Sequence, residues 1–215
     1  MWEYEAGWVE IACPREVPSS TSFHAVAVCA VADTPTSSAL RHLESQRNLR
    51  ESMADKVLVL HGGELASDIA ERIAKDAAAH SVTMQVASME SFKEFKLDSS
   101  ETVQTVIFVV QTIENEAAPE AAGSCCRFFK RKTHAADLLA GKLRFAVLAL
   151  GDSNLLLDRQ TTTAKDCNQV GQTLDARLAE LGAERFCARG EADERTGLTE
   201  VEPWIASLWA ALAAK

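Results

Sequence analysis

The residues with the clearest chemical potential are Gly151, Asp152 and Ser153, which follow a short apolar run. A serine beside a carboxylate is the motif of hydrolases of the Gly-Asp-Ser type, in which a histidine acts as general base. Those hydrolases carry the histidine after the serine, whereas all five histidines of this chain precede Ser153. The sequence therefore argues against nucleophilic serine catalysis, and we expect no catalytic residue of this kind.

The six cysteines do not have the spacing of a metal site. The sequence has no Cys-x-x-Cys pair and no Cys/His cluster at zinc-finger spacing, so we predict no metal ligands. Cys125 and Cys126 are neighbours, but consecutive residues of a helix point in different directions, which favours inert thiols. Reduced cysteines are typical of the cytosol, and we expect the protein to be cytoplasmic.

Other phosphate-binding and phospho-acceptor motifs are also missing. The chain has no G-x-G-x-x-G and no Walker A sequence, so a dinucleotide-binding or P-loop domain lacks its phosphate cradle. A phospho-acceptor receiver domain needs an acidic pair after its first strand and an aspartate after its third. Here those positions hold His61-Gly62 and Gln111-Thr112, which excludes that chemistry.

Composition limits the class of partner. The chain has 215 residues, 47% of them hydrophobic, with a net charge of −9. Nucleic-acid binding relies on clustered Lys and Arg, so we expect no nucleic-acid partner, and a charged partner is expected to present a basic face. The apolar run 23–32 is too short for a bilayer and the N-terminus is acidic, so we predict no membrane span and no signal peptide.

The elements that must position these residues are expected to begin near Met53. Residues 1–52 are rich in Ser, Thr and Pro without a helical or strand period, and we interpret them as a poorly ordered N-terminal extension. Met53 leads almost directly into a buried strand, so the folded domain is predicted to span residues 53–215. That part carries 18 Lys and Arg against 24 Asp and Glu, which leaves it acidic.

From Val57 onward, short apolar runs alternate with amphipathic segments. Strands are predicted at 57–60, 82–87, 106–110, 145–150 and 185–188. Helices are predicted over 66–77, 124–139, 170–181 and 201–212, the third ended by Gly182 and the last begun by a capping box of Thr199 and Glu202. This alternation predicts an α/β three-layer sandwich: a five-stranded parallel sheet of order 2-1-3-4-5 with helices on both faces. Ligands of such sheets bind beyond the carboxyl ends of the strands, here the loops after Leu60, Val110 and Leu150.

The third loop and the C-terminus resemble the flavodoxins and the FMN domains of diflavin reductases. Leu148–Asn154 resembles the strand-to-loop segment L-x-G-L-G-D-S of that family, and Gly190–Leu198 with Glu202–Trp209 is similar to its closing stretch. Leu178–Ala183 and Asp68–Glu71 match as well. The resemblance covers roughly residues 56–212 and implies a flavodoxin-like fold that binds FMN and transfers electrons.

The resemblance implies FMN as the cofactor, held by three loops, with the redox chemistry supplied by the flavin itself. The candidate FMN-binding residues are His61, Gly62, Gly63, Glu64, Leu65, Ala66 and Ser67 in the first loop, Thr112, Ile113, Glu114 and Asn115 in the second, and Leu150, Gly151, Asp152, Leu155 and Asn168 in the third.

All three loops depart from the family's pattern. Residues 61–67 replace the pattern T-x-T-G-x-[ST] and are about two residues shorter, and Glu64 adds a negative charge where the phosphate would lie. Glu114 and Glu116 stand where the family has glycines, and Leu155 stands where it has a ring-stacking tyrosine. These changes leave two functions open: an FMN-binding electron carrier, and a flavin-free interaction module of the same fold.

The likeness also carries an expectation about partners. The chain has no FAD- or NADPH-binding half after the FMN-like part, so an electron donor is expected to act in trans. An acidic surface suits docking to a basic-faced reductase or electron acceptor, because complementary charge speeds encounter. Acidic residues that only keep the protein soluble explain the charge equally well.

Overall fold

The computed structural model describes residues 56–113, 117–156 and 167–214, so the extension expected at 1–52 lies outside the described residues. The strands are β1 Lys56–Gly62, β2 Thr83–Ser88, β3 Gln104–Gln111, β4 Leu143–Gly151, β5 Glu184–Arg185 and β6 Gly190–Asp193. The helices are α2 Glu64–Asp76, α3 Glu120–Phe129, α4 Gln169–Glu180 and α5 Val201–Ala213, with short 3₁₀ helices η1 Ala77–His80, η2 Met89–Phe95, η4 Ser153–Leu156 and η6 Glu194–Thr196.

The strands form one parallel sheet in the order β2-β1-β3-β4-β5, which confirms the predicted order. The single strand predicted at 185–188 is wrong in detail. Only Glu184 and Arg185 pair with β4 as β5, and the chain leaves the ladder before it pairs with β4 again as β6. Arg189, between the two strands, is drawn to the carboxylate of Asp175 in α4, which explains the break.

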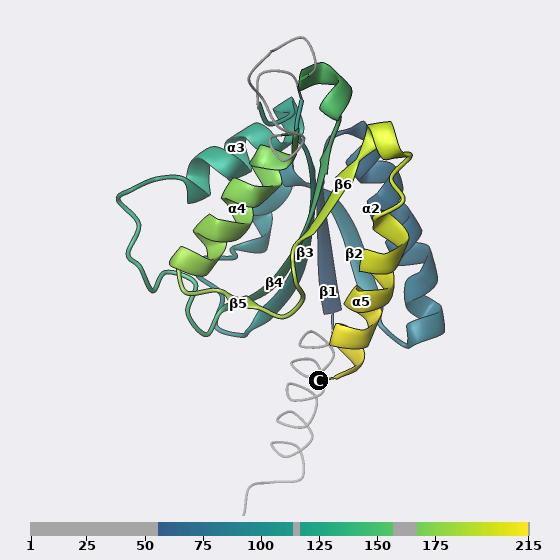
Figure 1. Ribbon diagram of the computed structural model, residues 1–215. Helices are drawn as coiled ribbons and strands as arrows, with labels where there is room; N and C mark the ends of the chain where they lie inside the picture. Colours follow the sequence, from purple (N-terminus) through teal and green to yellow (C-terminus); the bar gives the residue numbers. More distant parts are fainter. Residues whose placement is uncertain (1–55, 114–116, 157–166, 215) are drawn as a thin grey trace, which may run out of the picture.

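Helices cover both faces of the sheet: α2 and α5 lie on one side, α3 and α4 on the other (Figure 1). Each strand contributes alternate side chains to the two layers. In β1, Val57 and Val59 pack with α2 and α5, whereas Leu58 and Leu60 pack on the α3 and α4 side. The central strands β3 and β4 are buried on both faces, and this is why their sequences are continuously apolar.

The helix predicted over 124–139 ends earlier than expected. α3 begins at Glu120 and stops at Phe129, before an irregular segment leads to β4. Arg177 of α4 donates hydrogen bonds to the carbonyl oxygens of Phe129 (2.9 Å) and Arg131 (2.9 Å). A side chain from another helix therefore satisfies carbonyl groups that continued helical bonding would otherwise use.

The last helix has the predicted packing face but not the predicted start. Its buried residues are Val201, Trp204, Ile205, Leu208, Trp209 and Leu212, as the sequence predicts. The capping box is not formed, because α5 begins after Glu200 and no side chain caps its first turn. Glu200 is the N-cap residue, and its carboxylate accepts a 3.0 Å hydrogen bond from the Thr196 hydroxyl.

Two further findings concern only the described part of the chain. None of its helices has the length and hydropathy needed to cross a membrane. Nor do its His, Cys, Asp and Glu side chains gather into a group that could hold a metal ion.

Candidate functional site

The carboxyl ends of β1, β3, β4 and β6 meet at one edge of the sheet, the upper edge in Figure 1. The register places Gly62 beside Val110, and Gly151 beside Asp193. The structure thus brings together the ends of the three predicted loops at the edge where open α/β sheets bind ligands.

The connection between β1 and α2 is a single residue. β1 ends at Gly62 and α2 begins at Glu64, with Gly63 between them at φ 117° and ψ 161°. This backbone conformation is essentially restricted to glycine. The N–H of Ser67 already donates to the Gly63 carbonyl at 3.0 Å, so the candidate residues 64–67 form the first helical turn rather than a loop.

The space beside Gly63 is filled by two side chains. A Cβ atom at Gly63 would lie 2.6 Å from Gln111 Oε1 and 3.4 Å from Pro119 Cγ. Gln111 is in turn held by Glu194, whose carboxylate accepts a 2.9 Å hydrogen bond from the Gln111 amide. Gly62 is equally enclosed, since a Cβ there would lie 2.6 Å from Cβ of Ala122. Both glycines serve close packing of the chain.

His61 belongs to the packing between β1 and α2. It alternates with Val57 and Val59 along β1 and is therefore on the α2 side of the sheet. Burial lowers the pKa of His61 below its usual 6.5, and the nearby charge of Glu71 opposes the shift only in part. At neutral pH the imidazole is accordingly neutral.

Thr112 ties the second connection to its neighbours. Its N–H donates to the Leu150 carbonyl at 2.7 Å, and its buried hydroxyl oxygen accepts a 3.2 Å hydrogen bond from the N–H of Val170 in the first turn of α4. Ile113 is 42% exposed and pairs with Ala117 in an antiparallel bridge. The other candidates of this loop, Glu114 and Asn115, lie outside the described residues.

The third connection begins after Gly151, the last residue of β4. A Cβ at Gly151 would overlap the carbonyl of Cys167, so only glycine fits there. The Asp152 carboxylate accepts a 2.8 Å hydrogen bond from the N–H of Asn154, which closes a tight turn. Leu150 before it is fully buried, and Leu155 belongs to η4, with its side chain outside what the structure describes.

Two candidate residues, His61 and Asn168, have a buried polar atom without a hydrogen-bond partner among the described residues, as does Ser153 in the third connection. Asn168 is the one of the two that lies at the third connection. Its side chain is buried, and its Oδ1 has no hydrogen-bond partner among the described residues. This oxygen lies 3.0 Å from the position that a Cβ of Gly151 would take, so it borders the third connection. A buried acceptor without a partner is costly and indicates a ligand donor or an ordered water at this point.

Asp193 fixes the third connection from the neighbouring strand. Its Oδ1 accepts 3.0 Å hydrogen bonds from the N–H groups of Ser153 and Arg195. Burial by itself raises the pKa of Asp193, but these hydrogen bonds and the charge of Arg195 outweigh it and bring the pKa below its usual 3.8. The carboxylate is therefore ionised across the physiological range.

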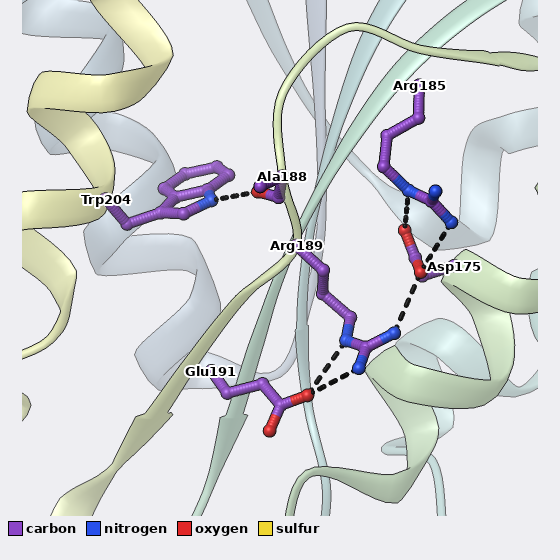
Figure 2. Close-up of polar contacts among 6 residues, drawn as sticks. All are labelled: Asp175, Arg185, Ala188, Arg189, Glu191 and Trp204. Atoms are coloured by element: carbon purple, nitrogen blue, oxygen red, sulfur yellow. Dashed lines mark hydrogen bonds and ion pairs between the residues drawn. The ribbon is translucent and has the colours of Figure 1, made fainter.

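A cluster of charged side chains holds β6 at its other end (Figure 2). Asp175 of α4 accepts two hydrogen bonds from Arg185, at 2.7 and 2.8 Å, and one from Arg189 at 2.9 Å. Glu191 accepts a further bond from Arg189 at 2.9 Å. The Asp175 side chain is only 3% exposed, so two guanidinium groups balance a buried charge. The cluster positions the strand that carries Asp193.

Sequence reasoning did not select Gln111, Asp193 or Glu194 as site residues. The available signal was the register of a parallel sheet, since the ends of adjacent strands lie side by side. Gln111 pairs with Leu150 and Asp193 pairs with Gly151, both of them candidate residues.

The sequence profile of the flavodoxin family matches residues 65–204. The chain belongs to the flavodoxin family. Methionine synthase reductase from Bos taurus is 38% identical over 148 residues, which are 68% of this chain and 20% of that relative. NADPH-dependent diflavin oxidoreductase 1 from Arabidopsis thaliana is 30% identical over 162 residues, 73% of this chain and 24% of the relative. The chain thus spans about a fifth to a quarter of these curated relatives.

Solved structures confirm the flavodoxin fold. A cysteine-to-serine variant of flavodoxin from Pseudomonas aeruginosa superposes with a TM-score of 0.56 at 23% identity, covering 74% of this chain and 99% of that one. The predicted kinship is therefore confirmed: this is a flavodoxin-like domain related to the FMN domains of diflavin reductases. FMN binding, electron transfer and oxidoreductase are terms that fit this family.

The described residues fit the two ends of FMN differently. At the third connection the buried Asn168 oxygen is an acceptor without a partner, and the contacts of Thr112 and Asp193 hold the second and third connections in place. On the phosphate side, the β1–α2 connection has no loop to surround an anion. The residues present therefore fit a flavin ring but do not fit its phosphate.

Proposed function

We propose that this flavodoxin-family chain is an electron-transfer module that takes a flavin ring at the carboxyl edge of its sheet and acts with a separate reductase. The observation that carries the proposal is the buried, unpartnered Oδ1 of Asn168 beside Gly151. A bound flavin supplies the electron chemistry, and the protein supplies orientation and electrostatics. The family membership supports the same conclusion.

The chain's own residues would orient the ring and keep the site in shape. Thr112 links the second connection to the start of α4, and Asp193 links the third connection to β6. Both links join segments that are far apart in the sequence, so they fix the spacing of the connections on either side of the ring. No Lys or Arg occurs in residues 61–67 or 111–119, so no cationic side chain of these segments attracts an anion.

The partner we propose is a basic-faced reductase or electron acceptor. Three carboxylates follow strand ends at the carboxyl edge of the sheet: Glu64, Asp152 and Glu194. They are part of the net negative charge of the chain. Complementary charge on a partner would raise the rate of encounter, and salt would reduce that rate. The four described cysteines are buried thiols without disulfides, which supports a cytoplasmic location.

A second candidate function is a flavin-free interaction module. The observation in its favour is the closed β1–α2 connection, where Gln111 and Pro119 occupy the space beside Gly63. In that case the fold would be retained for docking alone, since a fold by itself does not deliver a function.

Flavin titration of the purified full chain separates the two candidates. For the electron-transfer module we expect quenching of flavin fluorescence and a shift of the visible flavin absorbance on binding.

Asn168→Ala should weaken flavin binding roughly tenfold through loss of one buried hydrogen bond. Because the Asn168 side chain caps nothing on α4, folding should be unaffected. Asn154→Ala, at an exposed position of η4, is the matched control. Absence of binding by every flavin tested would leave the flavin-free module.

A further inference from the structure

The phosphate end of the candidate site has too little backbone to hold an anion. A phosphate at a helix N-terminus is held by free N–H groups of the first turn and of the loop that precedes it. Here the preceding segment is Gly63 alone, and the Ser67 N–H is already bonded to the Gly63 carbonyl. The N–H groups of Glu64, Leu65 and Ala66 remain, together with that of Gly63 itself, without a longer loop to close around the anion.

Side chains pack against Gly63, the residue that precedes this helix end. Gln111 lies so close to Gly63 that a single methyl group there would overlap it. The Gln111 amide is fixed by Glu194, and Pro119 packs on the same side. These contacts come from three different parts of the chain.

The charges at this end are of the wrong sign. Glu64 is the first residue of α2 and is exposed, and Glu194 reaches the same region through its bond to Gln111. A carboxylate about 4 Å from a phosphate weakens binding roughly fivefold even in water. Residues 61–67 and 111–119 contain no Lys or Arg to offset this repulsion. The guanidinium of Arg195, next to Glu194, lies 3.8 Å from the Asp193 carboxylate, which balances its charge in part.

We propose that this site does not bind the phosphate of FMN and that its ligand class is neutral flavins, so that riboflavin binds at least as tightly as FMN. The proposal rests on the proposed function, because it names the form of flavin that the electron-transfer module takes. The proposed ligand differs from FMN, the cofactor that the family resemblance implies. The specificity follows from the length of one connection and from two carboxylates.

The test compares riboflavin and FMN on the full chain, by fluorescence quenching and by calorimetry. We expect the dissociation constant of riboflavin to be equal to that of FMN or lower. Binding of FMN more than about threefold tighter than riboflavin would overturn the inference and leave the electron-transfer function standing. Binding of neither flavin would overturn both.

Salt and a charge variant give an independent readout. Added salt screens repulsion, so the affinity for FMN should rise between low and high ionic strength while that for riboflavin stays constant. Glu64→Gln should raise FMN affinity about fivefold and leave riboflavin affinity unchanged. The matched control is Asp76→Asn, the same change of charge at the exposed C-terminal end of α2, which should alter neither affinity. Unchanged FMN affinity in Glu64→Gln, or a fall of FMN affinity with salt, contradicts the inference.

Discussion

The amide of Gln111 and the carboxylate of Glu194 are joined by a 2.9 Å hydrogen bond across 83 positions of sequence. The bond connects the end of β3 with the turn after β6, and the Gln111 side chain lies against Gly63 at the end of β1. Three strand ends are therefore coupled at the edge where the family places its cofactor.

Gly63→Ala should strongly destabilise the fold. The substitution combines a backbone conformation that costs a non-glycine residue about 1–3 kcal/mol with a steric overlap on Gln111. We expect a loss of about 3 kcal/mol in the free energy of unfolding, measured by urea denaturation. Gly197→Ala is the control: φ is also positive there, at 72°, but no atom lies within 4 Å of the new Cβ. It should cost only about 1 kcal/mol, and equal losses in the two variants would refute the role of Gln111.

The Asp193 carboxylate should make the protein acid-sensitive. Because its folded pKa lies below the unfolded value of 3.8, its contribution to stability is fully present above that pH. The contribution is lost as the pH falls through the folded pKa. The difference in unfolding free energy between the wild type and Asp193→Asn should thus be largest near neutral pH and shrink toward about pH 2. Urea titrations across that range measure it, and a difference that does not depend on pH would disprove the ionic role.

Asp175→Asn should destabilise the protein through the cluster in Figure 2. The change removes the charge that balances Arg185 and Arg189 while leaving both guanidinium groups in place. Since those groups are partly exposed, we expect a loss of about 2 kcal/mol in unfolding free energy rather than the larger cost of a fully buried pair. Glu191→Gln removes a half-exposed partner of Arg189 and should cost less than about 1 kcal/mol. Thermal unfolding of both variants provides the comparison.

The described cysteines should react slowly in the folded protein. Burial raises the pKa of all four, Cys125 well above its usual value and Cys167 to about 11. At mildly alkaline pH the thiolate fraction is therefore small, and access is restricted as well. In a background of Cys13→Ser and Cys29→Ser, labelling by a disulfide reagent should be at least about tenfold slower than in urea. Rapid labelling of the native protein would contradict this burial.

Much of the fold follows from sequence periodicity, because parallel strands and their covering helices carry distinct patterns. The continuous apolar runs at 106–110 and 145–150 identify strands buried on both faces, and β3 and β4 contain them. The helix closed by Gly182 also ends as predicted, with that glycine at a φ of 86°. Each of these features depends on the pattern of neighbouring residues in the sequence.

The features that sequence reasoning missed depend on contacts between distant segments. The end of α3 is set by Arg177, 48 positions beyond Phe129, and the break between β5 and β6 by Asp175. At the site, the shortened first connection could be recognised from its length, but its closure by Gln111 could not. Such side-chain placements become visible only once the register of the sheet is known.

The one-residue connection between β1 and α2 also limits how this protein can change. Since Gly63 already adopts a conformation that other residues resist, exchanging side chains cannot widen the gap between Gly62 and Glu64. Only an insertion alters the reach of the backbone there. A directed-evolution library of substitutions would leave the length of the connection unchanged, whereas a library of short insertions at this point would vary it. If riboflavin and FMN bind as proposed, the length of this connection gives protein engineering a means of selecting phosphorylated or unphosphorylated ligands on an otherwise constant scaffold.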